Sequence, residues 1–356
     1  MAHLANCAII DAQGSSAHST MDVISHLRKN HCIERIFALV DGDLAREGRL
    51  SFIDKRIHAQ ALLEAGADCV VQMPLPTQML PDNLYAFSIE AMLRKLGAIT
   101  DLALPVCGDS GLFYRVSDHL FDEPAPYRAT MHALRAQGRD LDEALPIAVG
   151  QQIPGADAFL ALPQNRLAVE CRNALRRAYS TVGVHLIEGA SPSPSVPVPA
   201  PRSDRFLLER LAEAFLARSE KETVAWAAEI YSGSARMALR LRQLLAEHAD
   251  TGLISFSERA ACADMSAISV RRYALSCLCG YRKVDGFVCN TYSFIPYIRV
   301  LAATDEALRG LKTTAGTTVI VDTADPREDL RISDVYKRLL LETENRARSL
   351  FLASDI

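Results

Sequence analysis

The sequence predicts an α/β fold with a parallel sheet in its first half, followed by a mainly α-helical second half. In the first half, short apolar segments alternate with longer segments whose apolar residues recur at helical spacing. The predicted helices are long enough to act as the crossovers that parallel strands need. A proline-rich segment, SPSPSVPVPAPR at 191–202, then separates this pattern from one that is almost entirely helical.

Four strands are predicted in the first half, at 8–11, 36–40, 69–73 and 102–106. The first strand leads into a helix that Ser19 or Thr20 can cap. The second leads into a helix with Ile57 and Leu62 on its apolar face, and Gly66 ends this helix as glycine typically does. Polar loops of nucleotide-binding size follow the strands at the carboxyl edge of the sheet, so the predicted domain is Rossmann-like.

We therefore expect a Rossmann-like domain at 1–190, a semi-rigid linker at 191–202 and a mainly helical domain at 203–356. In the second domain, Ser219 and Glu222 fit a capping box for the helix that holds Trp226. Further helices are predicted at 206–218, 237–245 and 269–278. Two apolar segments at 297–302 and 317–322, and a final helix from Ile332, predict a small α/β tail.

The composition is that of an ordinary globular protein, with 49% apolar and 23% charged residues. The net charge of -4 excludes a global attraction to nucleic acid or to an anionic membrane, so any RNA contact must come from a local basic patch. The nine cysteines are scattered without a CxxC pair, which favours reduced thiols and a cytoplasmic location. No segment approaches the roughly 18 apolar residues of a membrane span, and the N-terminal apolar run is too short for a signal peptide.

The loop between the first strand and its helix, DAQGSSAHST at 11–20, suits an anion. Its small residues would let a phosphate approach the backbone N–H groups at the start of the helix. A plain polar loop with good turn residues explains the same composition. His18 is the only histidine in this loop, so it cannot supply the paired imidazoles that some nucleotidyltransferases aim at ATP phosphates.

The loop after the second strand mixes charges. Arg46 and Arg49 can meet phosphate or RNA, whereas Asp41 and Asp43 would repel a triphosphate unless Mg²⁺ lies between them. The alternative is a solvated loop.

Two further positions fit either a site or plain structure. Gly108 ends the fourth strand, where glycine allows a ligand to approach the backbone, but an ordinary turn also accounts for it. Asn165 precedes a helix, where it would serve as an N-cap or present its amide to a base edge. The sequence has no Walker loop, GxGxxG, HExxH or GxSxG motif, and no metal-ligand spacing.

Basic residues gather in the second half, partly beside tyrosines. Guanidinium groups next to aromatic rings suit phosphate contacts combined with base stacking, although each cluster alone also fits a solvated helix face. We expect several of them to face one surface together with Arg46 at the cleft between the domains. The predicted RNA-binding residues are Arg236, Arg240, Arg271, Arg272, Arg282 and Lys283.

The chain resembles the bacterial tRNA(Met) cytidine acetate ligases, a family of the nucleotidyltransferase superfamily. The resemblance covers most of the chain and consists of motifs in matching order: CAIIDAQGSSAHSTMD, LVDGDLAREGRLSFIDKRIHAQALLEAGADCVVQMP, VCGDS, LPQNRLAVECRNAL, SVRRYALSCLCG and YIRVLAATDEALRGLKTT. Each motif is weak alone, but six in the same order are fairly specific for homology.

The resemblance implies an ATP-dependent ligase that activates acetate as acetyl-adenylate and acetylates the wobble cytidine of elongator tRNA(Met). The implied cofactor is ATP, and Mg²⁺ is a further candidate. The implied partners are tRNA and acetate. Carried over by position, the implied ATP-binding residues are Ile9, Gly14, Ser15, Ser16, His18, Ser19, Thr20, Gly108 and Asn165.

The departures from the family concern the phosphate site. Ala17 and Thr20 stand where the family has the two loop histidines of its HxGH motif, and Asp41 replaces the serine of its Ser-Gly pair. His18 and Arg46 are then the candidate catalytic residues. The alternative is a non-catalytic relative, a pseudoenzyme that uses the same surfaces to bind tRNA or a protein partner.

Overall fold

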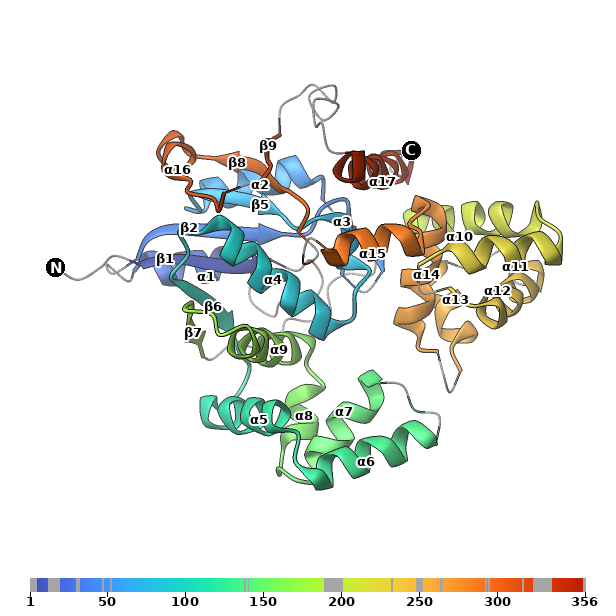
Figure 1. Ribbon diagram of the computed structural model, residues 1–356, viewed down its shortest axis with the longest axis horizontal. Helices are drawn as coiled ribbons and strands as arrows, with labels where there is room; N and C mark the ends of the chain where they lie inside the picture. Colours follow the sequence, from blue (N-terminus) through green and yellow to red (C-terminus); the bar gives the residue numbers. More distant parts are fainter. Residues whose placement is uncertain are drawn as a thin grey trace.

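A computed structural model of the protein describes residues 5–354 except 12–19, 30–32, 47, 52, 138, 140, 189–200, 232, 248–251, 263–264, 292, 294, 316 and 323–334. A seven-stranded, mostly parallel sheet forms its centre, with strand order β7-β6-β1-β2-β5-β8-β9 (Figure 1). The predicted α/β class with a parallel sheet and a helical part is confirmed. No helix in the described ranges has both the length and the apolar character needed to cross a membrane.

The four predicted strands are present and slightly longer or shorter than expected. The strands of the sheet are β1 (Ala5–Asp11), β2 (Ile33–Val40), β5 (Cys69–Gln72), β6 (Asp101–Pro105), β7 (Gly183–Ile187), β8 (Ile298–Ala303) and β9 (Val319–Val321). All neighbouring strands pair in parallel except β5 and β8, which are antiparallel. A separate hairpin of β3 (Leu44–Ala45) and β4 (Arg49–Leu50) extends the loop after β2.

Helices cover both faces of the sheet. Helices α1 (Thr20–Arg28) and α2 (Lys55–Glu64) bury Ile24 and Leu62 on one face, and α4 (Asp82–Leu96) and α9 (Pro163–Arg177) bury Met92 and Leu167 on the other. Ile57, expected on the apolar face of α2, is instead 67% exposed. Both faces of the central strands are therefore buried, as in other doubly covered parallel sheets.

Helices that the strand–helix pattern does not predict form a lobe after β6. They are α5 (Ser110–Asp122), α6 (Ala125–Ala136), α7 (Leu141–Gly150) and α8 (Ala156–Leu160). Figure 1 shows this lobe below the sheet, with α9 leading back to β7. The lobe's apolar residues, such as Phe113 and Leu145, are continuous with the core of the sheet.

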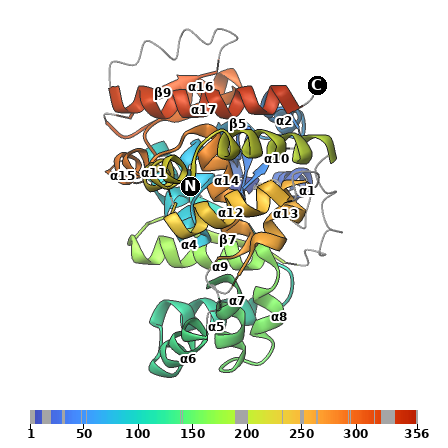
Figure 2. The ribbon, with the colours of Figure 1, turned by 90° about the vertical axis from the view of Figure 1, so that its right-hand side faces the viewer.

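The second half of the chain packs against the loops at the carboxyl edge of the sheet. Its core, with Leu211 and Phe256, also includes Leu44 and Leu75 of the first half. Figure 2, turned by 90°, shows α10, α12 and α13 in front of the strands. The helices outside the lobe and the sheet faces are α3 (Leu75–Gln78), α10 (Pro201–Leu216), α11 (Glu220–Glu229), α12 (Ala235–Glu247), α13 (Leu253–Ala260), α14 (Ala267–Cys279), α15 (Lys283–Thr291), α16 (Asp305–Gly310) and α17 (Val335–Ser354).

The predicted capping box is confirmed, because Ser219 and Glu222 exchange hydrogen bonds at the start of α11. The predicted linker lies largely outside the described residues. The first described element after it is α10. The division into 1–190 and 203–356 stays a prediction. Strands β8 and β9, however, come from the second half and complete the sheet of the first.

Candidate functional site

The carboxyl edge of the sheet has a switch point between β1 and β6. After β1 the chain builds β2 and β5 on one side, and it then crosses to β6 on the other side. Ligands of doubly wound sheets bind where the chain changes direction in this way. Of the residues predicted to bind ATP, Gly14, Ser15, Ser16, His18 and Ser19 lie outside the described residues. Thr20 begins α1, and Ile9 lies within β1 with its side chain in the apolar core.

Gly108 follows β6 at this edge and has a φ of +108°. A Cβ atom placed there would meet only the ring of Phe159, at 3.7 Å, so the backbone is not enclosed by other described residues. Asp109 comes next and caps α5, since its side chain accepts a hydrogen bond from Leu112 N at 2.8 Å. The loop thus brings an open glycine backbone to the switch point.

Asn165 holds this loop in place from beneath. Its prediction as an N-cap is wrong, because α9 begins at Pro163 with Leu162 as the cap. The fully buried Asn165 amide instead accepts from Cys107 N at 2.8 Å and donates to Cys107 O at 2.8 Å and to Phe159 O at 3.1 Å. Because all of these hydrogen bonds are internal, the amide positions the Gly108 loop and does not present itself to a base edge.

A buried carboxylate and a histidine meet at the end of β1, where sequence reasoning found neither. Asp11 is the last residue of β1, and its Oδ2 forms a short contact with Nε2 of His58 from the first turns of α2. Burial alone would lower the pKa of His58, but the hydrogen bond and charge of Asp11 raise it above its ordinary value. The His58 side chain is 14% exposed, so it combines a fixed orientation with limited access to solvent. An imidazole held in this way by a carboxylate suits proton transfer.

The loop after β2 is buried, which overturns its reading as a solvated loop. Asp41 is fully buried and accepts hydrogen bonds from Arg46 N at 3.1 Å, Gln78 Nε2 at 3.3 Å and the Tyr85 hydroxyl at 3.2 Å. Burial raises the pKa of Asp41 to about 6, and these partners limit the rise.

Asp43 faces two cations from the protein. Lys55 Nζ lies 2.8 Å from one of its oxygens, and Arg348 of α17 lies 2.7 Å from the other. The charge of Asp43 is therefore balanced within the protein by Lys55 and Arg348. These contacts tie the C-terminal helix α17 to the edge of the sheet.

Arg46 belongs to a buried arginine cluster, which we define as Arg46, Arg166 and Arg272 around Asp82. Their guanidinium nitrogens lie 3.5, 2.9 and 3.7 Å from the carboxylate oxygens. Burial opposes ionisation of Asp82, but the three arginines hold its pKa below its usual range. The cluster joins the hairpin, α4, α9 and α14, so Arg46 has a place in the junction between the two halves of the chain.

The predicted RNA-binding residues separate into two groups. Arg271 and Arg272 are 5% and 8% exposed, and Arg271 donates to Ser257 Oγ at 3.1 Å. Arg272 does lie beside Arg46 at the junction of the two halves, but both Arg271 and Arg272 are too buried to form the expected RNA-binding surface. The exposed members are Arg236, Arg240, Arg282 and Lys283.

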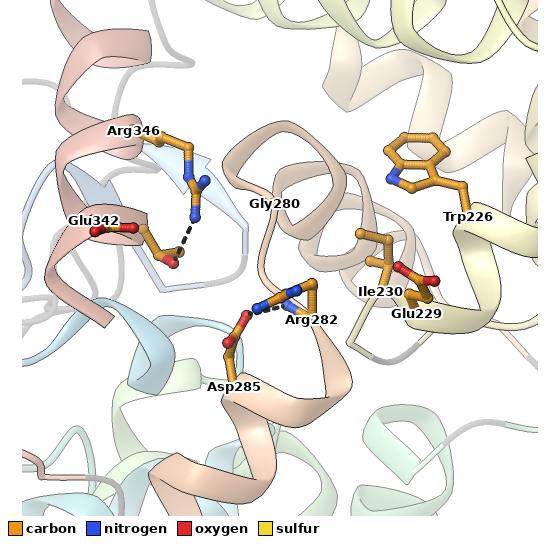
Figure 3. A pocket seen from close by; sticks show the side chains of 9 residues that line it. Trp226, Glu229, Ile230, Gly280, Arg282, Asp285, Glu342 and Arg346 are labelled. Carbon is orange, nitrogen blue, oxygen red and sulfur yellow. Dashed lines mark hydrogen bonds and ion pairs between the residues drawn. The ribbon is translucent and has the colours of Figure 1, made fainter. Parts of the chain in front are cut away.

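Two cavities in the second half contain members of the exposed group. One, of about 350 Å³, lies between α11, α15 and α17 and is lined by Trp226, Arg282 and Arg346 among others (Figure 3). There Arg282 pairs with Asp285 at 3.5 Å. The other, of about 590 Å³, lies along α12 and contains Arg236 and Arg240. Within the described ranges, no group of three or more His, Cys, Asp or Glu side chains is arranged to hold a metal ion.

Comparison with known proteins gives a distant sequence similarity. No family model matches the chain. The chain is 26% identical over 169 residues to the tRNA(Met) cytidine acetate ligase of Clostridium kluyveri, a match that covers 44% of this chain and 41% of that protein. It is 28% identical over 119 residues to the ligase of Clostridium acetobutylicum, covering 32% of this chain and 30% of that one. In sequence, the chain thus spans about two fifths of the first of these relatives and less of the second.

The similarity in fold extends over nearly the whole chain. The structure of Thermotoga maritima TmcAL bound with alpha-thio ATP matches with a TM-score of 0.74 and 19% identity, covering 96% of this chain and 91% of that one. The apo form matches with a TM-score of 0.76 and 17% identity, covering 97% and 93%. The chain therefore shares the fold of these structures and has relatives in sequence among the tRNA(Met) cytidine acetate ligases.

Proposed function

We propose that the protein binds ATP at the switch point between β1 and β6 and acts in tRNA modification as a member of the tRNA(Met) cytidine acetate ligase family. The observation that carries the proposal is the carboxyl edge itself. There, the neighbouring strands β1 and β6 end at the Asp11–His58 pair and just before the open backbone of Gly108, respectively. The sequence similarity to ligases of this name and the shared fold support it.

The proposed reaction needs a proton acceptor, which His58 supplies. In acetyl transfer from an acyl-adenylate, the amine nitrogen of cytidine bonds to the carbonyl carbon, and the carbon–oxygen bond to the phosphate breaks. The electron pair of that bond leaves on the phosphate oxygen, and the proton of the attacking amine passes to His58. A general base works best when its pKa lies near the operating pH, which Asp11 favours by raising the pKa of His58.

The test of catalysis is acetate-dependent exchange between ATP and pyrophosphate, together with acetylation of elongator tRNA(Met) transcripts. His58→Gln should leave ATP binding unchanged and lower acetylation by about 10²–10⁴-fold. Full activity in this variant would contradict the role of His58, whereas absence of activity in the unmodified protein would contradict the proposed reaction.

The test of the ATP site uses two glycines that share a positive φ. Gly108 has a φ of +108° at the switch point, and Gly155 has a φ of +81° in the helical lobe. Alanine at either position costs backbone strain of about 1 kcal/mol. Only Gly108→Ala should weaken ATP binding measured by calorimetry, and equal effects of the two variants would place the nucleotide elsewhere.

A non-catalytic binding protein is the second candidate function. The observation that favours it is the arginine cluster, because Arg46 is 1% exposed at its side chain and faces Asp82. Arg46 in this position stabilises the junction and does not reach a leaving pyrophosphate. If tRNA binds with no acetate-dependent exchange, this second function replaces the first.

A further inference from the structure

A residue of the C-terminal helix holds the start of α2. Arg348 of α17 donates from one guanidinium nitrogen to Asp43 at 2.7 Å and from another to Asp54. Asp43 belongs to the loop after β2, and Asp54 is the N-cap of α2. One planar side chain therefore bridges two carboxylates at the entry into α2, although it lies 294 positions from the cap in the chain.

Asp54 is bonded in turn to the backbone of His58. Its side chain accepts a hydrogen bond from Arg56 N at 2.8 Å, and its carbonyl accepts one from His58 N at 2.9 Å. The His58 ring is held separately by Asp11 of β1. Because an N-cap sets the place of the first turn of its helix, a shift of Asp54 would move the His58 backbone relative to Asp11.

An alternative account treats Arg348 only as a tether between α17 and the sheet. Charge balance at Asp43 does not require the second contact of Arg348, because Lys55 Nζ already lies 2.8 Å from Asp43. The contact with Asp54 acts on the cap instead. Burial raises the pKa of Asp54, but the hydrogen bond from Arg348 brings it below its usual range. The cap therefore stays ionised, which favours its interaction with the N-terminus of α2.

We propose that Arg348 is a positioning residue for His58, which it keeps in line with Asp11 through the N-cap Asp54. The inference rests on the proposed function, because it gives the second half of the chain a part in placing the proposed general base. A guanidinium group can bridge two carboxylates with separate N–H groups, whereas an ammonium group acts as a point charge.

The pKa of His58 distinguishes positioning from a simple change in charge. In Arg348→Gln, a displaced His58 loses the hydrogen bond with Asp11, so its pKa should fall towards the ordinary value of 6.5. Loss of the Arg348 charge acting directly on His58 would instead raise this pKa, because a nearby cation disfavours protonation. An NMR titration of His58 therefore gives opposite signs for the two effects, and an unchanged or raised pKa would overturn the proposal.

Hydrogen exchange of the His58 amide tests the backbone contact with Asp54. This amide should exchange faster in Arg348→Gln, and Arg348→Lys should restore only part of its protection. Asp54→Asn keeps a good N-cap but removes the ion pair with Arg348. Combining it with Arg348→Gln should speed exchange little beyond the larger single effect, because both changes break the same contact. Additive effects would contradict a route through Asp54.

Arg172→Gln is the matched control. The side chain of Arg172 is 18% exposed and that of Arg348 is 22% exposed. Both guanidinium groups donate to a carboxylate and lie over an aromatic ring, at 5.0 Å and 5.4 Å from its centroid. Arg172→Gln should leave the pKa and amide exchange of His58 unchanged. Equal effects of the two variants on His58 would overturn the proposal, because general loosening would then explain both.

The measurements on His58 need neither ATP nor tRNA, so they separate this inference from the proposed function. A lower His58 pKa in Arg348→Gln, with no acetylation even by the unmodified protein, would support the positioning and contradict the ligase reaction. In an active protein, Arg348→Gln should lower kcat by about 10–100-fold with little change in KM for ATP, because a misplaced catalytic group reacts slowly. An unchanged kcat, with His58→Gln inactive, would overturn this inference alone.

Discussion

Asp11 and His58 are 47 residues apart in the chain but meet at the end of β1. Because Asp11 raises the pKa of His58, the pair stabilises the folded state fully below the unfolded-state pKa of 6.5. This contribution is lost as the pH rises through the higher folded-state value. Asp11→Asn should therefore lower the pKa of His58 in an NMR titration, and it should reduce the free energy of unfolding more at a pH of about 6 than at about 9.

The control for this titration is His119, which lies on α5 in the helical lobe and whose pKa is lowered by burial. Its resonance should titrate identically in the unmodified protein and in Asp11→Asn. A His58 titration that Asp11→Asn leaves unchanged would mean that Asp11 does not set its protonation.

Asn165 offers a second test at the scale of one residue. Asn165→Ala removes the partners of Cys107 N, Cys107 O and Phe159 O inside the protein. We expect the free energy of unfolding in urea to fall by about 2–3 kcal/mol, because buried polar groups left without partners are costly. Gln60→Ala, on the exposed side of α2, should change it by less than about 0.5 kcal/mol. A urea midpoint equal to that of the unmodified protein would contradict the positioning role of Asn165.

At the scale of elements, the hairpin of β3 and β4 packs so closely against α14 that there is no room for a side chain at Gly48. Gly48 has a φ of +70°, and a Cβ atom there would lie 2.6 Å from Arg272 N. Gly48→Ala should lower the free energy of unfolding by about 1–3 kcal/mol and speed hydrogen exchange in α14, because the helix must move away.

Gly280→Ala is the control that distinguishes the effect of a steric clash from that of backbone strain. Gly280 has a similar φ of +66°, but the nearest atom to an added Cβ is Arg346 Cζ at 3.6 Å. This variant should show the strain without faster exchange in α14 next to the hairpin. If both variants behave alike, the contact between hairpin and α14 is not a tight one.

In the first half, the alternating strands and helices up to β6 were predictable, but the helices α5 to α8 of the lobe and the pairing partners of the strands were not. Strands β1, β2, β5 and β6 follow from local alternation of apolar and polar segments, which the sequence shows directly. The pairing of strands that are far apart in the chain is not visible in local sequence patterns. The sequence therefore predicts β8 as part of a separate α/β tail, whereas it pairs with β5.

Side-chain environments were the least predictable part of the site. Arg271 and Arg272 look like surface cations in the sequence, yet the fold places them against Ser257 and Asp82. A charged residue is buried when a distant partner compensates it, and that partner is not visible in local spacing. The Asp11–His58 pair is not predictable from local spacing for the same reason, because its two residues are 47 positions apart.

At the scale of the whole molecule, the first half should not fold alone. A fragment of residues 1–190 lacks β8, so the edge of β5 and its apolar residues Val70 and Val71 would be uncovered. We expect this fragment to be insoluble when expressed alone and soluble when expressed together with 201–356. A soluble fragment 1–190 with the far-ultraviolet circular dichroism of a folded α/β domain would show that the two halves are independent domains.

The pairing of β5 with β8 also has a consequence for synthesis of the protein in the cell. Residues 69–72 leave the ribosome long before residues 298–303 that pair with them. At about 5–20 residues per second, the nascent chain carries an open strand edge for on the order of ten seconds or longer. The period of translation between these two strands is therefore when this chain most needs a chaperone, and synonymous codons that slow translation there should increase its aggregation.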